Sequence, residues 1–126
     1  MSTGFRLSAQ QERVWIQNGE QNKPRWAECE ALLEGALDVS TLYQSVQNVV
    51  RRHEILRTVF RRRPELKLPF QVIQDVYDFA WQTADLMGLS FCDQRISIQT
   101  RVRAQQDGLS LETGPLLGVV LALVAP

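Results

Sequence analysis

The stretch Arg51-Arg52-His53-Glu54-Ile55-Leu56-Arg57-Thr58-Val59-Phe60 lies where a helical pattern of apolar residues gives way to an alternating one, and it holds the only histidine of the chain. Before it, the apolar residues from Val39 to Val50 recur at the spacing of one helix face. Asp38 is placed to cap that helix, and the arginines at its end complement the helix dipole. After Glu54 the period falls to two, which predicts a strand from Ile55 to Arg62.

This alternation raises a question about Arg57. It places the guanidinium beside Val59, on a strand face that a covered sheet would bury. A buried guanidinium needs an anionic partner or several acceptors, because an unpaired buried charge costs roughly several kcal/mol. Spacing alone favours the plainer interpretation, in which this face is solvated and Arg57 is one of several surface arginines.

Composition limits the classes of function. The chain has 126 residues, of which 44% are hydrophobic and 22% charged, as is typical of one soluble globular domain or part of a larger one. A formal net charge of zero gives no reason to expect nucleic acid or an anionic membrane as partner. Arginines cluster between Arg51 and Arg63, but only Phe60 lies among them as an aromatic residue. A solvated rim or an acidic protein partner therefore fits this cluster better than a nucleic acid.

Cysteine usage and the chain start suggest the compartment. Cys29 and Cys92 are far apart and match no metal-ligand spacing, so we expect no metal site. The polar start of the sequence leads us to expect no signal peptide, and the longest apolar run, Val119 to Pro126, is far shorter than a membrane span. These features predict a cytoplasmic protein with free thiols, in which Cys29 is a small core residue.

The segments before the central stretch predict a helix and a strand. Ser8 followed by Gln11 is a capping-box pattern, which predicts a helix from Ala9 to about Asn18. A polar loop is expected from Asn18 to Pro24. The alternation from Ala27 to Glu34 predicts a half-buried strand with an acidic outer face.

The segments after it complete an α/β pattern. Phe70 to Val76 is expected to pair with the central strand as an antiparallel hairpin, and Phe79 to Thr83 to form a further short strand. Phe91 to Gln106 is expected to be a helix with one weakly apolar stripe. Leu117 to Val124 is apolar throughout, which is typical of a central strand in a covered sheet. The weakly apolar stripe expected on the helix from Phe91 to Gln106 consists of Ile96, Gln99, Val102 and Gln106. The order predicts a layered α/β architecture, with helices on one face of a mixed β-sheet.

Four landmarks resemble one family. Arg52 to Phe60 resembles the second core motif of nonribosomal peptide synthetase condensation domains, Arg-His-Glu-x-Leu-Arg-Thr-x-Phe. Leu7 to Trp15 is similar to the first core motif, Ser-x-Ala-Gln-x-Arg-(Leu/Met)-(Trp/Tyr), with a departure at Gln10. Gly35 to Asp38 and Gly114 to Leu117 resemble the family's Gly-x-Leu-Asp and Gly-Pro-Leu-Leu. The matched core-motif positions are Ser8, Gln11, Arg13, Trp15, Arg52, His53, Glu54, Leu56, Arg57, Thr58 and Phe60.

The motifs are shared in part by the epimerization and cyclization relatives, so the resemblance leaves the subtype open. One stretch departs from the family: it usually reads Pro-Phe-Asp-Leu where this sequence has Leu109-Ser110-Leu111-Glu112.

The resemblance implies a fold and an activity. It implies that residues 1–126 form an incomplete first lobe of a chloramphenicol-acetyltransferase-like fold, whose two lobes surround a channel. The complete domain joins a donor acyl or peptidyl group to an acceptor amine, both held as thioesters on the phosphopantetheine arms of carrier domains. The arginine that matches Arg57 pairs with the aspartate of the catalytic motif, His-His-x-x-x-Asp-Gly, and holds that loop as a structural support.

The catalytic motif follows the Gly-Pro-Leu-Leu strand in the family, and the sequence ends before that point. We therefore expect no catalytic residue, no bound cofactor or metal, and no activity of this segment alone. We also expect Arg57 to face water, a bound anion or another chain, so that Arg57→Ala would cost little stability.

Two other interpretations remain. The chain could be a non-catalytic docking or interaction module, because an unpaired apolar strand such as Leu117 to Val124 recruits a partner. The expected partners are the rest of a condensation domain, carrier or adenylation domains, or a second copy of the chain, and neither nucleic acid nor a membrane. A basic nucleic-acid-binding domain has only the arginine cluster in its support.

Overall fold

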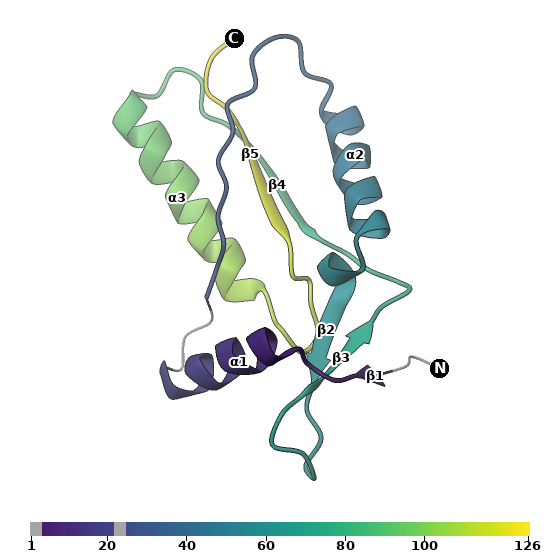
Figure 1. Cartoon of the computed structure of the whole chain (residues 1–126). Helices are drawn as coiled ribbons and strands as arrows, with labels where there is room; N and C mark the ends of the chain where they lie inside the picture. The colour runs from purple at the N-terminus through teal and green to yellow at the C-terminus, as the bar shows by residue number, and fades with distance from the viewer. Residues whose placement is uncertain (1–3, 22–24) are drawn as a thin grey trace.

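The computed structural model describes residues 4–21 and 25–126, and the predicted α/β class is confirmed. The described strands form two sheets. One is antiparallel, with strand order β1-β3-β2, and the other is parallel and pairs β4 with β5. Figure 1 shows β4 and β5 running between α3 and α2, whereas α1 lies beside the antiparallel sheet. The elements are β1 (Gly4–Phe5), α1 (Ala9–Gln21), α2 (Val39–Arg52), the 3-10 helix η1 (Glu54–Arg57), β2 (Thr58–Arg61), β3 (Phe70–Ile73), β4 (Ala80–Asp85), α3 (Phe91–Gly108) and β5 (Gly118–Leu123).

Helix α1 begins as its capping box predicts. The Ser8 amide donates to Oε1 of Gln11 at 2.8 Å, and the Gln11 amide donates to Oγ of Ser8 at 3.2 Å. The helix continues past the expected end at Asn18 to Gln21, so the first part of the predicted polar loop is wrong. The remaining part of that loop, residues 22–24, lies outside the described residues.

Helix α2 begins at Val39, directly after the predicted cap. The Asp38 carboxylate accepts from the amide of Thr41 at 3.0 Å and from the hydroxyl of Ser40 at 2.9 Å. These hydrogen bonds favour the ionised form and lower the pKa of Asp38 below its ordinary value of 3.8. The last turn contains Arg51 and Arg52, which complement the C-terminal end of the helix dipole.

The predicted strand from Ala27 to Glu34 is wrong. Residues 25–37 form no helix or strand, and every one of them is exposed, including Cys29, which is therefore not a core residue. The segment contacts α3 through side chains: Glu28 accepts from Gln106, and Glu30 pairs with Arg95. Alternation alone does not make a strand, because a strand also needs a ladder partner. Both cysteines are free, as expected.

The hairpin is confirmed, but its first strand starts later than predicted. The residues before it coil into η1, in which the Leu56 amide donates to the His53 carbonyl at 3.0 Å. The Thr58 hydroxyl then donates to the Glu54 carbonyl at 2.7 Å and ends the turn. Strand β2 pairs antiparallel with β3 in the register Val59 to Val72, and both of these side chains are buried. Arg57 therefore lies at the end of η1 and not in the middle of a strand.

Helix α3 and strands β4 and β5 occur where they were expected, but the predicted stripe on α3 is wrong. Ile96 and Gln99 are exposed. The helix instead reaches the strands through amide groups. Gln94 donates to the carbonyls of Leu86 and Val124 at 3.0 and 2.9 Å, and Gln105 donates to that of Val119 at 2.9 Å. An amide that satisfies backbone carbonyls can occupy a partly buried face without a large desolvation penalty.

Strand β5 has β4 as its one strand neighbour among the described residues, so it is not flanked on both sides there. The two strands pair in parallel over their whole length, from Ala80 with Gly118 to Asp85 with Leu123. No helix of the described ranges is long and apolar enough to cross a bilayer.

Candidate functional site

Arg57 is held at the open end of the hairpin by Gln74, the residue that follows β3. The Gln74 amide donates to the Arg57 carbonyl at 2.9 Å, and Nη1 of Arg57 donates to the Gln74 carbonyl at 2.9 Å. The β2–β3 register pairs Thr58 with Ile73, so in an antiparallel hairpin the next opposed pair is Arg57 and Gln74. The two hydrogen bonds therefore extend the register by one residue. The Arg57 side chain is only 17% exposed. Arg57 is thus mostly covered by its own chain. Of the three surroundings expected for it, the structure speaks against water, whereas a bound anion or another chain stays a prediction.

The charge of Arg57 is only partly matched by its surroundings. The carboxylate of Glu54 lies 3.8 Å from Nη2, but this acid is 64% exposed, so water screens the pair. The guanidinium lies 5.9 Å from the centre of the Tyr77 ring, within the range of a cation–π contact. Nε of Arg57 is buried and has no hydrogen-bond partner within the described part of the chain. Arg57 therefore retains a donor for one more acceptor.

The two core motifs meet at the antiparallel sheet. The side-chain amides of Gln11 on α1 and Gln71 on β3 donate to each other at 3.2 and 3.3 Å. Gln71 also donates to the Arg6 carbonyl at 2.8 Å. Trp15 and Phe60 pack with ring centres 6.4 Å apart. Helix α1 is thus tied to both strands of the hairpin that follows Arg57.

Other motif residues are not gathered at this place. Arg13, Arg52 and His53 are exposed, and the described contacts of His53 involve its main chain, whose amide donates to the Val49 carbonyl at 3.0 Å. Thr58 is 3% exposed, and its hydroxyl serves the turn before β2. The described residues include no group of three histidines, cysteines or acids that could hold a metal ion.

Sequence reasoning missed three residues that surround the motifs: Gln74, Tyr77 and Glu112. A signal existed for Gln74, because antiparallel pairing extended by one residue places it opposite Arg57. No local pattern indicated Glu112, which follows α3 and lies 3.0 Å from Nε of Arg62. In the same region the Phe60 amide donates to the Leu111 carbonyl at 2.7 Å, so this turn covers the outer edge of β2.

Comparison with known proteins identifies this arrangement. The model of the family described as "Condensation domain" matches residues 1–125. The chain belongs to the condensation-domain family. Among curated relatives, this condensation-domain chain is 37% identical to chondramide synthase cmdD of Chondromyces crocatus over 86 residues. It is 32% identical to phosphinothricin tripeptide synthetase PhsB of Streptomyces viridochromogenes over 116 residues.

Solved structures share the fold. A mutant of the starter condensation domain of rhizomide synthetase RzmA superposes with a TM-score of 0.75 at 21% identity, over 99% of this chain and 30% of that one. The epimerization domain from the third module of tyrocidine synthetase B gives a TM-score of 0.73 at 19% identity, over 98% of this chain and 27% of that one. The matches cover 68% and 90% of this chain but only 2% and 10% of the two curated relatives. This condensation-domain chain therefore spans a small part of the proteins it resembles.

Proposed function

We propose that this chain forms part of the first lobe of a condensation domain that joins a carrier-bound acyl or peptidyl thioester to an aminoacyl amine. The observation that carries this proposal is the state of Arg57, a motif arginine that is mostly buried and keeps an unused Nε donor. An arginine on a solvated face would donate to water and would need no further acceptor from the protein. The unused donor suits a carboxylate supplied by another segment of the domain, since a buried guanidinium is stabilised by a hydrogen-bonded acid.

The reaction requires positioning above all. The acceptor amine attacks the thioester carbonyl, the carbon–nitrogen bond forms, the carbon–sulfur bond breaks, and the amine loses a proton as the thiol leaves. Phosphopantetheine arms on carrier domains supply the thiols that hold both substrates. Orientation of the two tethered groups and stabilisation of the tetrahedral intermediate lower the barrier. Arg57 acts as a positioning residue, because it would hold the loop that carries the reacting groups and would not touch the substrates.

The proposed partners are the remainder of the condensation domain and its neighbouring carrier domains. The two curated relatives, chondramide synthase cmdD and phosphinothricin tripeptide synthetase PhsB, are many times longer than this chain, which supports neighbours of this kind. The exposed His53 forms no ion pair with an acid in the described ranges 4–21 and 25–126, and we expect no amide formation by residues 1–126 alone.

The test uses the full polypeptide encoded by the reading frame that contains this chain, with donor and acceptor carriers loaded. We expect mass spectrometry to detect the condensed product on the acceptor carrier. Arg57→Ala should lower the rate at least about tenfold, because removal of a charged hydrogen-bonding partner weakens loop positioning by about 1.5–3 kcal/mol. Arg103→Ala, at an exposed position on α3, is the matched control and should leave the rate unchanged. Equal rates for both variants, or no His-His-x-x-x-Asp-Gly segment in the reading frame, would contradict the proposal.

A second candidate, a non-catalytic interaction module, is favoured by the single strand neighbour of β5 in the described structure. An unpaired strand edge is a template for pairing with another chain. Specific co-purification with a neighbouring synthetase domain, in the absence of any condensed product, would support this candidate over the first.

A further inference from the structure

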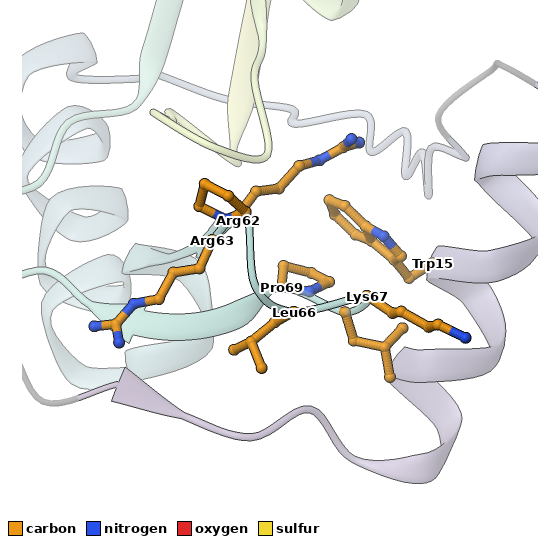
Figure 2. A pocket seen from close by; sticks show the side chains of 8 residues that line it. Trp15, Arg62, Arg63, Leu66, Lys67 and Pro69 are labelled. Carbon is orange, nitrogen blue, oxygen red and sulfur yellow. The ribbon is translucent and has the colours of Figure 1, made fainter.

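The loop that joins β2 to β3 forms a hollow together with α1. The hollow has a volume of about 360 Å³ and is lined by Trp15 and by loop residues between Arg62 and Pro69. Figure 2 shows Trp15 reaching from α1 toward the loop. None of the contacts assigned above to the support of Arg57 involves this hollow, so it is a separate surface of the molecule.

The positive charge of Arg62, which lines one wall of the hollow, already has an acid beside it. The guanidinium of Arg62 lies 5.1 Å from the centre of the Trp15 ring, and its Nε lies 3.0 Å from Glu112. Glu112 lies beside Arg62, so the pair carries no net charge, although water screens it because the two side chains are 70% and 52% exposed. Arg62 therefore shapes the wall but offers little net charge to a ligand.

Two other cations of the loop remain available. Neither Arg63 nor Lys67 forms an ion pair with an acid in the described ranges 4–21 and 25–126. The Arg63 guanidinium lies 4.7 Å from the centre of the Phe70 ring, so its position is defined without neutralising its charge. In Figure 2 the side chains of Arg63 and Lys67 extend in opposite directions, with Leu66 and Pro69 between them. Leu66 is 55% exposed although it is a large apolar residue.

We propose that this hollow binds an acidic segment of a partner protein, which places carboxylates at Arg63 and Lys67 and an apolar side chain against Leu66. The argument is charge complementarity around an apolar centre. Two unmatched cations attract carboxylates and set their spacing, while an apolar side chain gains free energy by covering exposed Leu66. Interfaces commonly combine an apolar anchor with a polar rim in this way.

The same contacts disfavour other ligands. Nucleic acid would need ring faces for base stacking, but Arg62 covers a face of Trp15 and Arg63 covers a face of Phe70. A small inorganic anion would leave Leu66 exposed and would meet only one of the two diverging cations. The proposal does not depend on amide formation, because the hollow uses none of the residues placed around Arg57.

The test measures fluorescence anisotropy of short labelled peptides with the full chain. The probe is a peptide in which acidic residues alternate with leucine, and two matched peptides replace leucine by serine or the acids by lysine. We expect binding of the acidic leucine peptide, weaker binding of the serine peptide and none of the lysine peptide. The double variant Arg63→Glu/Lys67→Glu should weaken binding at least about tenfold, and added salt should weaken binding to the unmodified chain. Leu66→Ser should weaken binding while keeping this salt dependence.

The control is the double variant Arg25→Glu/Arg103→Glu, which makes the same change in net charge at exposed positions outside the hollow. It should bind the probe as the unmodified chain does. Thermal unfolding of each variant verifies that a lost signal does not come from lost structure. Equal weakening by the control, equal affinity for the serine peptide, or tighter binding of a single-stranded oligonucleotide would each overturn the proposal.

Discussion

Nη1 of Arg57 and the main-chain nitrogen of Gln74 each form a 2.9 Å hydrogen bond to the other residue's carbonyl, so the two residues are paired twice. The motif arginine is therefore fixed by the hairpin that follows it and needs no distant partner to be placed. Its buried Nε has no hydrogen-bond partner among the described residues, and this donor is the basis of the proposal that another segment of the domain supplies an acceptor.

Arg57→Ala should lower the free energy of unfolding by about 1–2 kcal/mol, which is more than the sequence alone led us to expect. The reason is that the Gln74 carbonyl loses a charged donor in a partly buried place. Urea denaturation followed by circular dichroism measures this change. Arg103→Ala on the exposed face of α3 should stay within about 0.5 kcal/mol of the unmodified chain. A loss well above about 2 kcal/mol would reveal a further buried partner of Arg57.

Gln94→Ala should destabilise the chain by about 1–3 kcal/mol. One side-chain amide donates to the carbonyls of Leu86 and Val124, so the substitution removes a donor from both. The Leu86 carbonyl keeps the Leu89 amide as a donor at 3.3 Å, so most of the cost comes from the Val124 carbonyl. Gln99→Ala, an exposed position on the same helix, serves as the control for helix propensity and should be near neutral. Equal midpoints for the two variants in urea would show that α3 is not held to the strands by Gln94.

Gly118→Ala and Gly108→Ala should have opposite effects. A Cβ at Gly118 would lie 2.5 Å from Oε1 of Gln105, so this amide would have to leave its hydrogen bond to the Val119 carbonyl, at a cost of about 1 kcal/mol. A Cβ at Gly108 meets nothing within 4 Å at the end of α3, and alanine there should stabilise by a few tenths to about 1 kcal/mol. Thermal melts of the two variants compare the effects. A stabilised Gly118→Ala variant would refute the contact.

The cap of α2 should make stability depend on pH in the acid range. The hydrogen bonds from Thr41 and Ser40 lower the pKa of Asp38 in the folded state, so the ionised form favours folding. This contribution is present above the unfolded pKa and is lost as the pH falls through the lower folded pKa. In Asp38→Asn the side chain can still cap the helix but no longer titrates. The difference in melting temperature between the two proteins should therefore shrink between about pH 5 and about pH 2, and a constant difference would contradict the assignment.

The isolated chain should self-associate as its concentration rises. Large apolar side chains are exposed where α3 begins and in the segment 25–37, including Phe91 at 75% and Leu32 at 75%. Exposed apolar side chains of this size favour association with a partner. Sedimentation velocity with a reductant, which excludes disulfides of Cys29 and Cys92, measures the effect. Phe91→Ser should reduce association, whereas Val76→Ser, at a 90% exposed residue between β3 and β4, should not. A monomer at all concentrations would count against this expectation.

Local interactions are the part of the structure that sequence reasoning predicted well. The capping box of Ser8 and Gln11 and the cap of Asp38 form as expected, because their partners lie three residues away along the chain. The hairpin of β2 and β3 also forms, since a short loop brings the two strands together at little entropic cost. The family motifs likewise predicted the class of protein correctly.

Distant contacts required the tertiary structure. The alternation from Ala27 to Glu34 looked like a strand, yet only the fold shows that no ladder partner meets it among the described residues. The apolar stripe expected on α3 failed because Gln94 and Gln105 find backbone carbonyls on segments far along the chain.

The sequence by itself determined the helix caps, the hairpin and membership of the condensation-domain family. The reason is that these features depend on residues that are close together in the sequence or on the spacing of motif residues. Only the tertiary structure decided how far Arg57 is buried, which of its donors lacks a partner among the described residues, and how Trp15, Arg62 and Glu112 come together. The physical reason is that burial and hydrogen-bond satisfaction depend on which remote segments meet, and no local pattern encodes that meeting.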